Sequence, residues 1–284
     1  MLKCDDSLMD TAPPVPRNKA DPIVNEAPLG LTRTANHVYT WSDGRAIYTP
    51  LPSVTTILKV IDKSGPIAGW ARREVASCAI RNLDALIAMR EEGGPDAAAK
   101  GLRSVPDNIL DKAANRGTQV HLLAEQIVRG QEPAVPEELA GHVNAYRRFL
   151  RDWSPRFVAV EQMVASLRFG FAGTFDAIAD IAGERWLLDI KTGNGVYPEA
   201  ALQVSAYGGA QFIGRPGDPR KYRLPKVDRF GVLRVLPDRT ELVPVAVDRS
   251  TFATFVRALE LWRWTQGAAR TVIGKPISKE GCAA

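Results

Sequence analysis

The chain has 284 residues, of which 45% are hydrophobic, so a packed core is possible and a protein disordered throughout is excluded. The formal net charge of +5 permits a nucleic-acid partner but is also met in proteins without one. The cysteines, Cys4, Cys78 and Cys282, are too scattered for a cysteine metal site or a disulfide framework.

The sequence also lacks membrane and export signals. It has no run of about 18 apolar residues, and its N-terminus carries acidic residues and prolines where a signal peptide needs an apolar core. We therefore expect a soluble, untargeted cytoplasmic protein without a membrane partner.

The first half of the chain predicts a lead-in, a hairpin and a helical lobe. Residues 1–30 are rich in Pro, Asp and Asn without periodicity, which predicts a flexible segment. Residues 31–155 then form one expected unit. Alternating aromatic residues around Ser42-Asp43-Gly44 predict a β-hairpin within it. Apolar residues at helical spacing predict helices over 53–61, 66–92, 107–129 and 136–152, with Ser53 capping the first and Gly93-Gly94-Pro95 ending the second.

The second half, residues 156–270, changes to a period of two. Strands are predicted over 156–167, 171–183, 185–192, 229–237 and 241–248. A helix over 198–214 separates the third strand from the fourth, and a helix over 250–267, capped by Ser250 or Thr251, closes the unit before a tail at 271–284. The expected fold is mixed α+β (α/β), with a central mixed β-sheet of about five strands flanked by helices and preceded by the helical lobe.

Charged residues at the ends of two apolar strands are the first functional signal. If 174–181 and 186–191 pair as an antiparallel hairpin, residue i lies opposite residue 367 minus i, which places Asp176 opposite Lys191. Asp176, Asp189 and Lys191 then leave one face of the hairpin together. Two carboxylates near an ammonium suit a hard divalent cation, although a cross-strand ion pair is the alternative.

Other polar residues fall where such a site could use them. Glu161 interrupts an apolar strand, either as a further carboxylate or as a solvent-facing residue. Gln203 and Tyr207 share one helix face after Lys191, and His121 lies on an earlier helix, where a histidine is often structural.

Six motifs in order resemble those of the PD-(D/E)XK nuclease superfamily. They are similar to the RecB-like branch, which includes phage exonucleases and the mitochondrial genome maintenance exonuclease, although Phe175 stands where the superfamily name has Pro. The motifs are PSVTTIL (52–58), RGTQVH (116–121), Glu161, GTFD (173–176), LLDIK (187–191) and QVSAY (203–207).

The resemblance implies a role for each site residue. His121, Asp176, Asp189 and the Ile190 carbonyl would bind one or two Mg²⁺ or Mn²⁺ ions. Lys191 would orient the attacking water, with Glu161, Asp176 and Asp189 completing the catalytic set, and Gln203 and Tyr207 would position the substrate backbone. The iron–sulfur cluster of some relatives needs four cysteines and is not expected.

The function implied is hydrolysis of phosphodiester bonds at DNA ends, leaving 5′-phosphates. It would serve phage or bacterial recombination, repair or replication, in the cytoplasm of a bacterial cell or phage-infected host. Single-stranded or duplex DNA ends would be the partner, with a recombination or single-strand-binding protein as a possible second. The alternatives are an inactive DNA-binding or assembly protein with the nuclease fold, and a structure- or sequence-specific endonuclease.

A basic loop is the expected DNA contact outside the site. Residues 215–229, RPGDPRKYRLPKVDR, combine several cations with an aromatic side chain. This composition suits phosphates and unpaired bases, and Lys221, Tyr222 and Arg223 are the candidate contacts. A solvated surface loop is the alternative interpretation.

Overall fold

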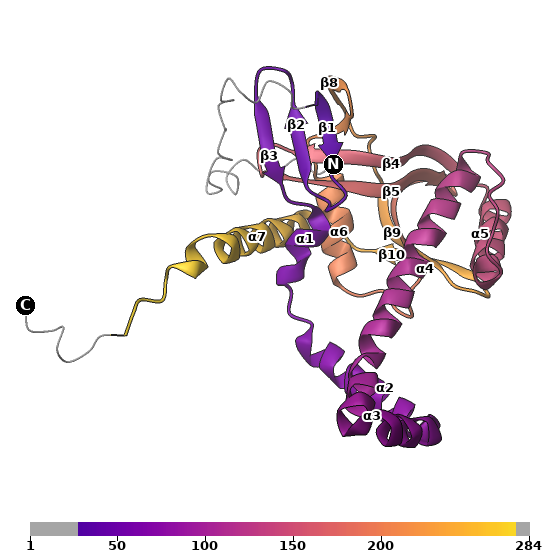
Figure 1. Ribbon diagram of the computed structural model, residues 1–284. Helices are drawn as coiled ribbons and strands as arrows, with labels where there is room; N and C mark the ends of the chain where they lie inside the picture. The colour runs from indigo at the N-terminus through magenta and orange to yellow at the C-terminus, as the bar shows by residue number, and fades with distance from the viewer. Residues whose placement is uncertain (1–27, 277–284) are drawn as a thin grey trace, which may run out of the picture.

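A computed structural model describes residues 28–276 of the chain. Its centre is a seven-stranded mixed sheet with the strand order β10-β9-β6-β5-β4-β7-β8. The predicted mixed sheet flanked by helices is confirmed, with two strands more than expected (Figure 1). The strands are β4 (Arg156–Ser166), β5 (Phe171–Ile181), β6 (Glu184–Lys191), β7 (Phe212–Arg215), β8 (Asp218–Tyr222), β9 (Arg229–Val235) and β10 (Thr240–Val245).

The additional strands come from segments predicted otherwise. The helix expected over 198–214 ends early, as α6 (Glu199–Gly208), and its last residues begin β7. The basic segment expected as a loop pairs with β7 as β8, an edge strand whose cations face solvent. Charged residues and Pro219 hide this strand from a sequence pattern, and both are usual on sheet edges.

The strand pairing is antiparallel except between β6 and β9. In the β5–β6 hairpin, Ala177 lies opposite Leu188 and Ile181 opposite Glu184, so residue i faces residue 365 minus i. The predicted register was therefore wrong by two residues. The loop is Ala182-Gly183, and both residues have positive φ, 50° and 83°, as a two-residue type I′ turn requires. A shift of two preserves side-chain parity, so on β6 Asp189 and Lys191 still face away from Trp186, Leu188 and Ile190, as predicted. Asp176, predicted on the same face as Asp189, instead contacts His121 of α4, whereas Asp189 contacts Gln203 of α6.

Helices cover both faces of the sheet. The remaining elements are α1 (Val54–Ile57), η2 (Leu58–Val60), α2 (Ser64–Arg81), α3 (Leu83–Arg103), α4 (Val105–Val128), η3 (Glu137–Leu139), α5 (Ala140–Trp153), α7 (Arg249–Gln266) and η4 (Ala268–Arg270). The face of the sheet that carries the Leu187 side chain packs against α1, α6 and α7, and the face that carries the Leu188 side chain packs against α4 and α5. Because side chains alternate between the two faces of β6, this strand contributes residues to two separate hydrophobic cores.

Helices α2 and α3 form an arm that carries no buried residue. Figure 1 shows this arm at the far end of α4, away from the sheet. The single helix expected over 66–92 is broken at Asn82. The predicted break at Gly93-Gly94-Pro95 is confirmed, because Gly94 has φ 76° and ψ 177°, which are not helical, and a further helical stretch runs from there to Arg103. Glycine adopts that backbone conformation without strain.

The N-terminal region forms a second, three-stranded sheet. Its strands are β1 (Gly30–Arg33), β2 (Tyr39–Ser42) and β3 (Ile47–Leu51), in that order. The predicted hairpin is β2–β3, and the Asp43 carboxylate accepts hydrogen bonds from the backbone N–H groups of Arg45 and Ala46 in its turn. Ser53 caps α1 as predicted. The expected lead-in lies almost wholly outside the described residues, as does part of the tail, and β1 was not predicted.

Within residues 28–276, no helix has the length and apolar character needed to cross a bilayer.

The cap of α7 is Asp248, not Ser250 or Thr251. Its side chain accepts from the Thr251 N–H, and the Thr251 hydroxyl is placed to accept from the Asp248 N–H, a capping box. The pKa of Asp248 is lowered to about 2, by the Ser250 hydroxyl first and then by Thr251.

Asp248→Ala should therefore lower the melting temperature, and the difference from the wild type should depend on pH. Because the folded pKa lies below the unfolded value, the stabilisation is complete above about pH 4 and disappears as the pH falls through about 2. Melting curves between pH 7 and pH 2 measure this. Asp248→Asn is the matched variant, since it keeps a capping oxygen and should show a weaker pH dependence. Equal melting temperatures for Asp248→Ala and the wild type at pH 7 would contradict the assignment.

Candidate functional site

The site lies where β5 and β6 meet helix α4 on one side and α6 on the other. His121 is near the middle of α4, Asp176 is on β5, and Asp189 and Lys191 end β6. Along α4, a Cβ at Gly117 would lie 3.5 Å from the Thr192 hydroxyl, an ordinary van der Waals distance, so the helix passes close to the end of β6 at this point. The fold thus brings a helix from the first half of the chain to the charged strand ends.

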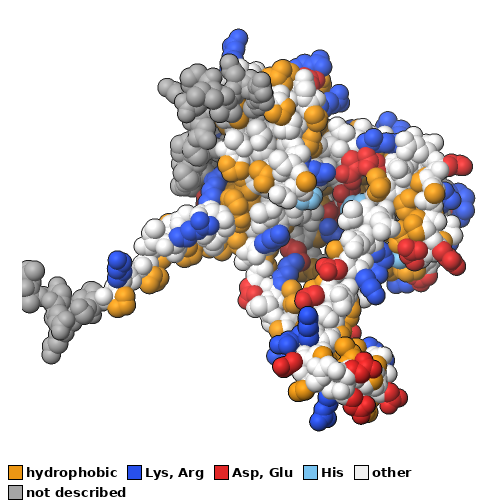
Figure 2. Space-filling model, viewed as in Figure 1, with side chains coloured by type: hydrophobic (Ala, Val, Ile, Leu, Met, Phe, Trp, Pro, Cys, Tyr) orange, Lys and Arg blue, Asp and Glu red, His pale blue; other side chains and the backbone are white. Residues whose placement is uncertain are grey.

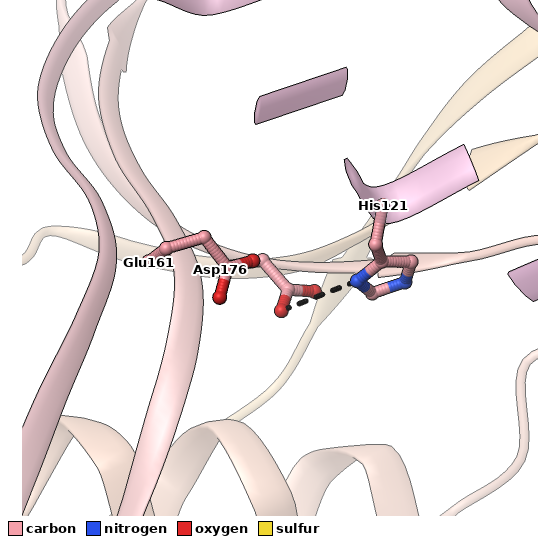
Figure 3. A group of neighbouring side chains, drawn as sticks. All are labelled: His121, Glu161 and Asp176. Carbon is pink, nitrogen blue, oxygen red and sulfur yellow. Dashed lines mark ion pairs between the residues drawn. The ribbon is translucent and has the colours of Figure 1, made fainter. Parts of the chain in front are cut away.

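Three possible metal ligands converge: His121, Glu161 and Asp176 each offer a ligand atom within 4.8 Å of the others. Figure 3 shows their side chains converging from α4, β4 and β5. His121 Nδ1 lies 3.5 Å from Asp176 Oδ1, and its Nε2 donates to the Ile190 carbonyl at 2.8 Å. One imidazole and two carboxylates suit Mn²⁺ or Mg²⁺.

This group differs from the ligand set implied by the resemblance. Asp189 lies outside the group, and in the protein the Ile190 carbonyl accepts a hydrogen bond from His121. Glu161, expected only as a catalytic residue, lies within it. The Asp176 carboxylate joins the group to β6, because its Oδ2 accepts from the Ile190 N–H at 2.5 Å.

The backbone at Glu161 has an unusual conformation. The β4–β5 register places Val160 opposite Ala177 and Gln162 opposite Phe175, so Glu161 faces the position of Asp176. Its φ is 48°, in the left-handed region that a non-glycine residue rarely adopts within a strand. Such conformations carry strain and cluster at functional sites.

The pKa values of Glu161 and His121 are both strongly raised. Burial first, and then the charge of Asp176, raises the pKa of Glu161 to about 7. Burial opposes the charged form of His121, but its hydrogen bond to Asp176 and the nearby carboxylates raise its pKa to about 9. A cation at this point would favour ionised Glu161 and would bind His121 only in its neutral form, so metal binding here would release the proton of the imidazole.

Asp189 is the most buried charged residue near the site, with 2% of its surface exposed. Its Oδ1 accepts from Gln203 Nε2 at 2.8 Å and from Lys191 Nζ at 3.1 Å. Its Oδ2 lies 2.9 Å from Lys191 Nζ, but no donor in the described structure is aligned for a hydrogen bond to it. Burial raises the pKa of Asp189. A buried carboxylate oxygen without a hydrogen bond is the atom that a cation or a water molecule would satisfy.

Gln203 and Tyr207, two polar residues on one face of α6, hold Asp189 in place. Gln203 donates to the carboxylate and to the Tyr207 hydroxyl, at 2.8 and 3.2 Å, and both side chains are buried. The predicted contact of Gln203 and Tyr207 with a substrate backbone stays a prediction. In the protein, these two side chains orient the Asp189 carboxylate. Lys191 also approaches Gln203, at 3.4 Å.

The predicted basic contacts occupy a different part of the sheet. Lys221 lies over the rings of Trp41 and Phe212, at 5.5 and 5.3 Å from their centroids, and the Tyr222 hydroxyl donates to Asp218. Arg223 is exposed. This basic edge is not among the elements that carry the ligand group.

One structural contributor was not predicted from the sequence. Arg234 on β9 lies opposite Lys191 and donates to the carbonyls of Gly193 and Asn194 at 3.0 and 2.5 Å, which fixes the loop that leaves the site. Glu241 on β10 in turn accepts from Arg234 at 2.8 Å. The sequence pattern of β9 did not single out Arg234, because a single arginine in an alternating strand is common. Its contact with the loop arises only from the parallel pairing of β6 with β9.

Comparison of the sequence with protein-family models finds no match, and the search of curated proteins finds none. The nuclease family therefore remains a hypothesis that rests on the ordered motifs and on the geometry of this site.

Proposed function

We propose that this protein is a divalent-metal-dependent nuclease that hydrolyses phosphodiester bonds at DNA ends. The observation that carries the proposal is the converging group of His121, Glu161 and Asp176, which lies beside the buried ion pair of Asp189 and Lys191. Burying that much charge is unfavourable for a protein without a use for it. The resemblance to RecB-like nucleases supports DNA as the substrate and exonuclease rather than endonuclease action.

The site residues would have two roles, metal binding and orientation of the attacking water or the phosphate. His121, Glu161, Asp176 and Asp189 would hold one or two Mg²⁺ or Mn²⁺ ions, which when bound supply Lewis-acid activation of a phosphoryl oxygen and of water. Lys191 keeps its positive charge beside Asp189: burial opposes that charge, but Asp189 raises the pKa of the lysine. It is therefore suited to orient water or phosphate and not to act as a base. Gln203 fixes Asp189 relative to Lys191.

The direct test is a time course on end-labelled linear DNA, single- and double-stranded, with circular DNA in parallel. Cleavage should require Mg²⁺ or Mn²⁺, stop with EDTA, return with added metal, and be faster on linear DNA. Undiminished cleavage in EDTA would refute the metal site. Equal digestion of circles would favour an endonuclease, and binding without any cleavage would favour an inactive nuclease-fold protein.

The basic edge gives an independent prediction about DNA binding. If Lys221 and Arg223 contact phosphates, replacing both with Gln should weaken binding to all sequences and reduce the slope of log K against log salt by about one to two. Fluorescence anisotropy at several salt concentrations measures this slope. Arg249→Gln with Arg257→Gln, two exposed cations on α7, is the matched control and should change it less. Equal slopes for the wild type and the Lys221/Arg223 variant would make this edge an ordinary solvated surface.

A further inference from the structure

A groove of about 600 Å³ opens directly beside Lys191 and Gln203. One wall comes from α1, η2 and the start of α2, and the other from the loop after β6 and the start of α6. Figure 2 shows the molecule hollowed between the sheet and the arm, with both basic and acidic side chains around the hollow. Because the groove shares Lys191 and Gln203 with the candidate site, a molecule bound in it would lie next to Asp189.

The lining is mostly apolar, and its charged residues are three lysines and two acids, Asp62 and Glu199. Leu58, Ile61 and Ala200 contribute apolar surface, and Lys59 and Lys63 are exposed. Such a lining suits a flat, mostly apolar ring that carries a negative charge nearby. Lys63 also pairs with Glu199, so an ion pair links α2 to α6 across one side of the groove.

The aromatic wall of the groove is Tyr197, which has 64% of its surface exposed. An exposed aromatic side chain on a loop would ordinarily be free to move, but this loop is held. Arg234 binds the carbonyls of Gly193 and Asn194, and the Tyr197 ring lies 3.5 Å from where a Cβ at Gly195 would be. Arg234 thus fixes the start of the loop that presents the Tyr197 ring to the groove.

We infer that this groove is a nucleobase subsite, in which Tyr197 stacks on an unpaired base of the strand being cleaved. The inference rests on the proposed function and narrows its substrate to DNA with an unpaired end. A base within a duplex is already stacked and paired, and could enter only by leaving the helix. An unpaired base has both faces free, and stacking on an aromatic side chain is tolerant of sequence.

The test replaces Tyr197 in the protein and the terminal bases in the probe, separately and together, and compares the dissociation constants. Binding is measured in EDTA, so the result does not depend on cleavage. The probes are a short oligothymidylate and the same oligomer with abasic residues at the terminal positions of both ends. Wild-type protein should bind the oligothymidylate about 5- to 150-fold more tightly than the abasic probe, the range expected for stacking of one base. Tyr197→Ala should lose this discrimination and Tyr197→Phe should keep it.

Trp264→Ala is the control, since Trp264 is an exposed aromatic residue on α7, outside the groove. It should discriminate like the wild type, and all variants should melt at the wild-type temperature because both side chains are exposed. Discrimination that survives in Tyr197→Ala would overturn the subsite, as would a wild-type protein that binds both probes equally or binds neither. Discrimination without cleavage in Mg²⁺ would support the subsite and refute hydrolysis, whereas cleavage without discrimination would do the reverse.

Discussion

Asp189→Asn should reduce DNA cleavage by at least about 100-fold while leaving the protein folded. The amide oxygen can still accept from Gln203, but the negative charge near the bound cation is lost. The carboxylate is buried with one oxygen lacking a hydrogen bond, so its charge is held at a cost to folding. Lys191, left without its partner, has 40% of its side chain exposed and can be hydrated. Initial cleavage rates and melting curves on the same preparations check both outcomes.

Asp180→Asn is the matched control for this substitution. Asp180 lies on β5 near the turn of the same hairpin and pairs with Arg156 and Arg185, away from the ligand group. Its replacement should leave cleavage within a few-fold of the wild type. If Asp189→Asn keeps full activity, or if Asp180→Asn is equally inactive, Asp189 has no special part in the reaction.

Mn²⁺ should raise the melting temperature of the wild type, and Glu161→Gln and His121→Ala should abolish most of that increment. A ligand that binds only the folded state at 100 times its Kd stabilises it by about 2.7 kcal/mol. Both residues belong to the group whose ligand atoms converge within 4.8 Å, so each variant removes one ligand. Without metal, His121→Ala also loses the hydrogen bond to the Ile190 carbonyl, for which we expect about 1 kcal/mol. Thermal unfolding across a Mn²⁺ titration separates the two effects.

Asp111→Asn provides the comparison, because it removes an acid from an exposed position on the same helix, α4. It should keep the whole Mn²⁺ increment. An increment of wild-type size in His121→Ala would make His121 a packing residue. The same result in Glu161→Gln would restrict the ligand group to its other members.

Local patterns in the sequence were sufficient for most elements. Period-two runs predicted β4, β5, β6, β9 and β10 because a half-buried strand alternates its environment at every residue. The hairpin turn at Asp43 and the Ser53 cap were also predictable, since a single side chain makes each of those hydrogen bonds within three residues. The same patterns could not reveal β8, where charged residues occupy an edge strand, and β7 was missed because its apolar residues continue the pattern of the helix before it.

The β5–β6 register shows how a correct element can be placed wrongly. Ala182 takes a positive φ that a sequence pattern assigns to Asn, Asp or Gly, so the turn was expected later in the chain. The face of Asp189 and Lys191 was still predicted correctly, because a shift of two residues does not change parity.

By itself, the sequence determined most of the chain's α and β segments and singled out Asp176, Asp189 and Lys191 as charged residues at the ends of apolar strands, where charge is costly without a partner. Only the tertiary structure decided which of these charges meet. It set Glu161 and His121 around Asp176, separated Asp189 from that group, and buried it against Gln203. It also placed Arg234 where it fixes the loop of Tyr197. Contacts such as that between His121 and Ile190, 69 residues apart, arise when a helix packs across a sheet, and no local periodicity records where it will cross.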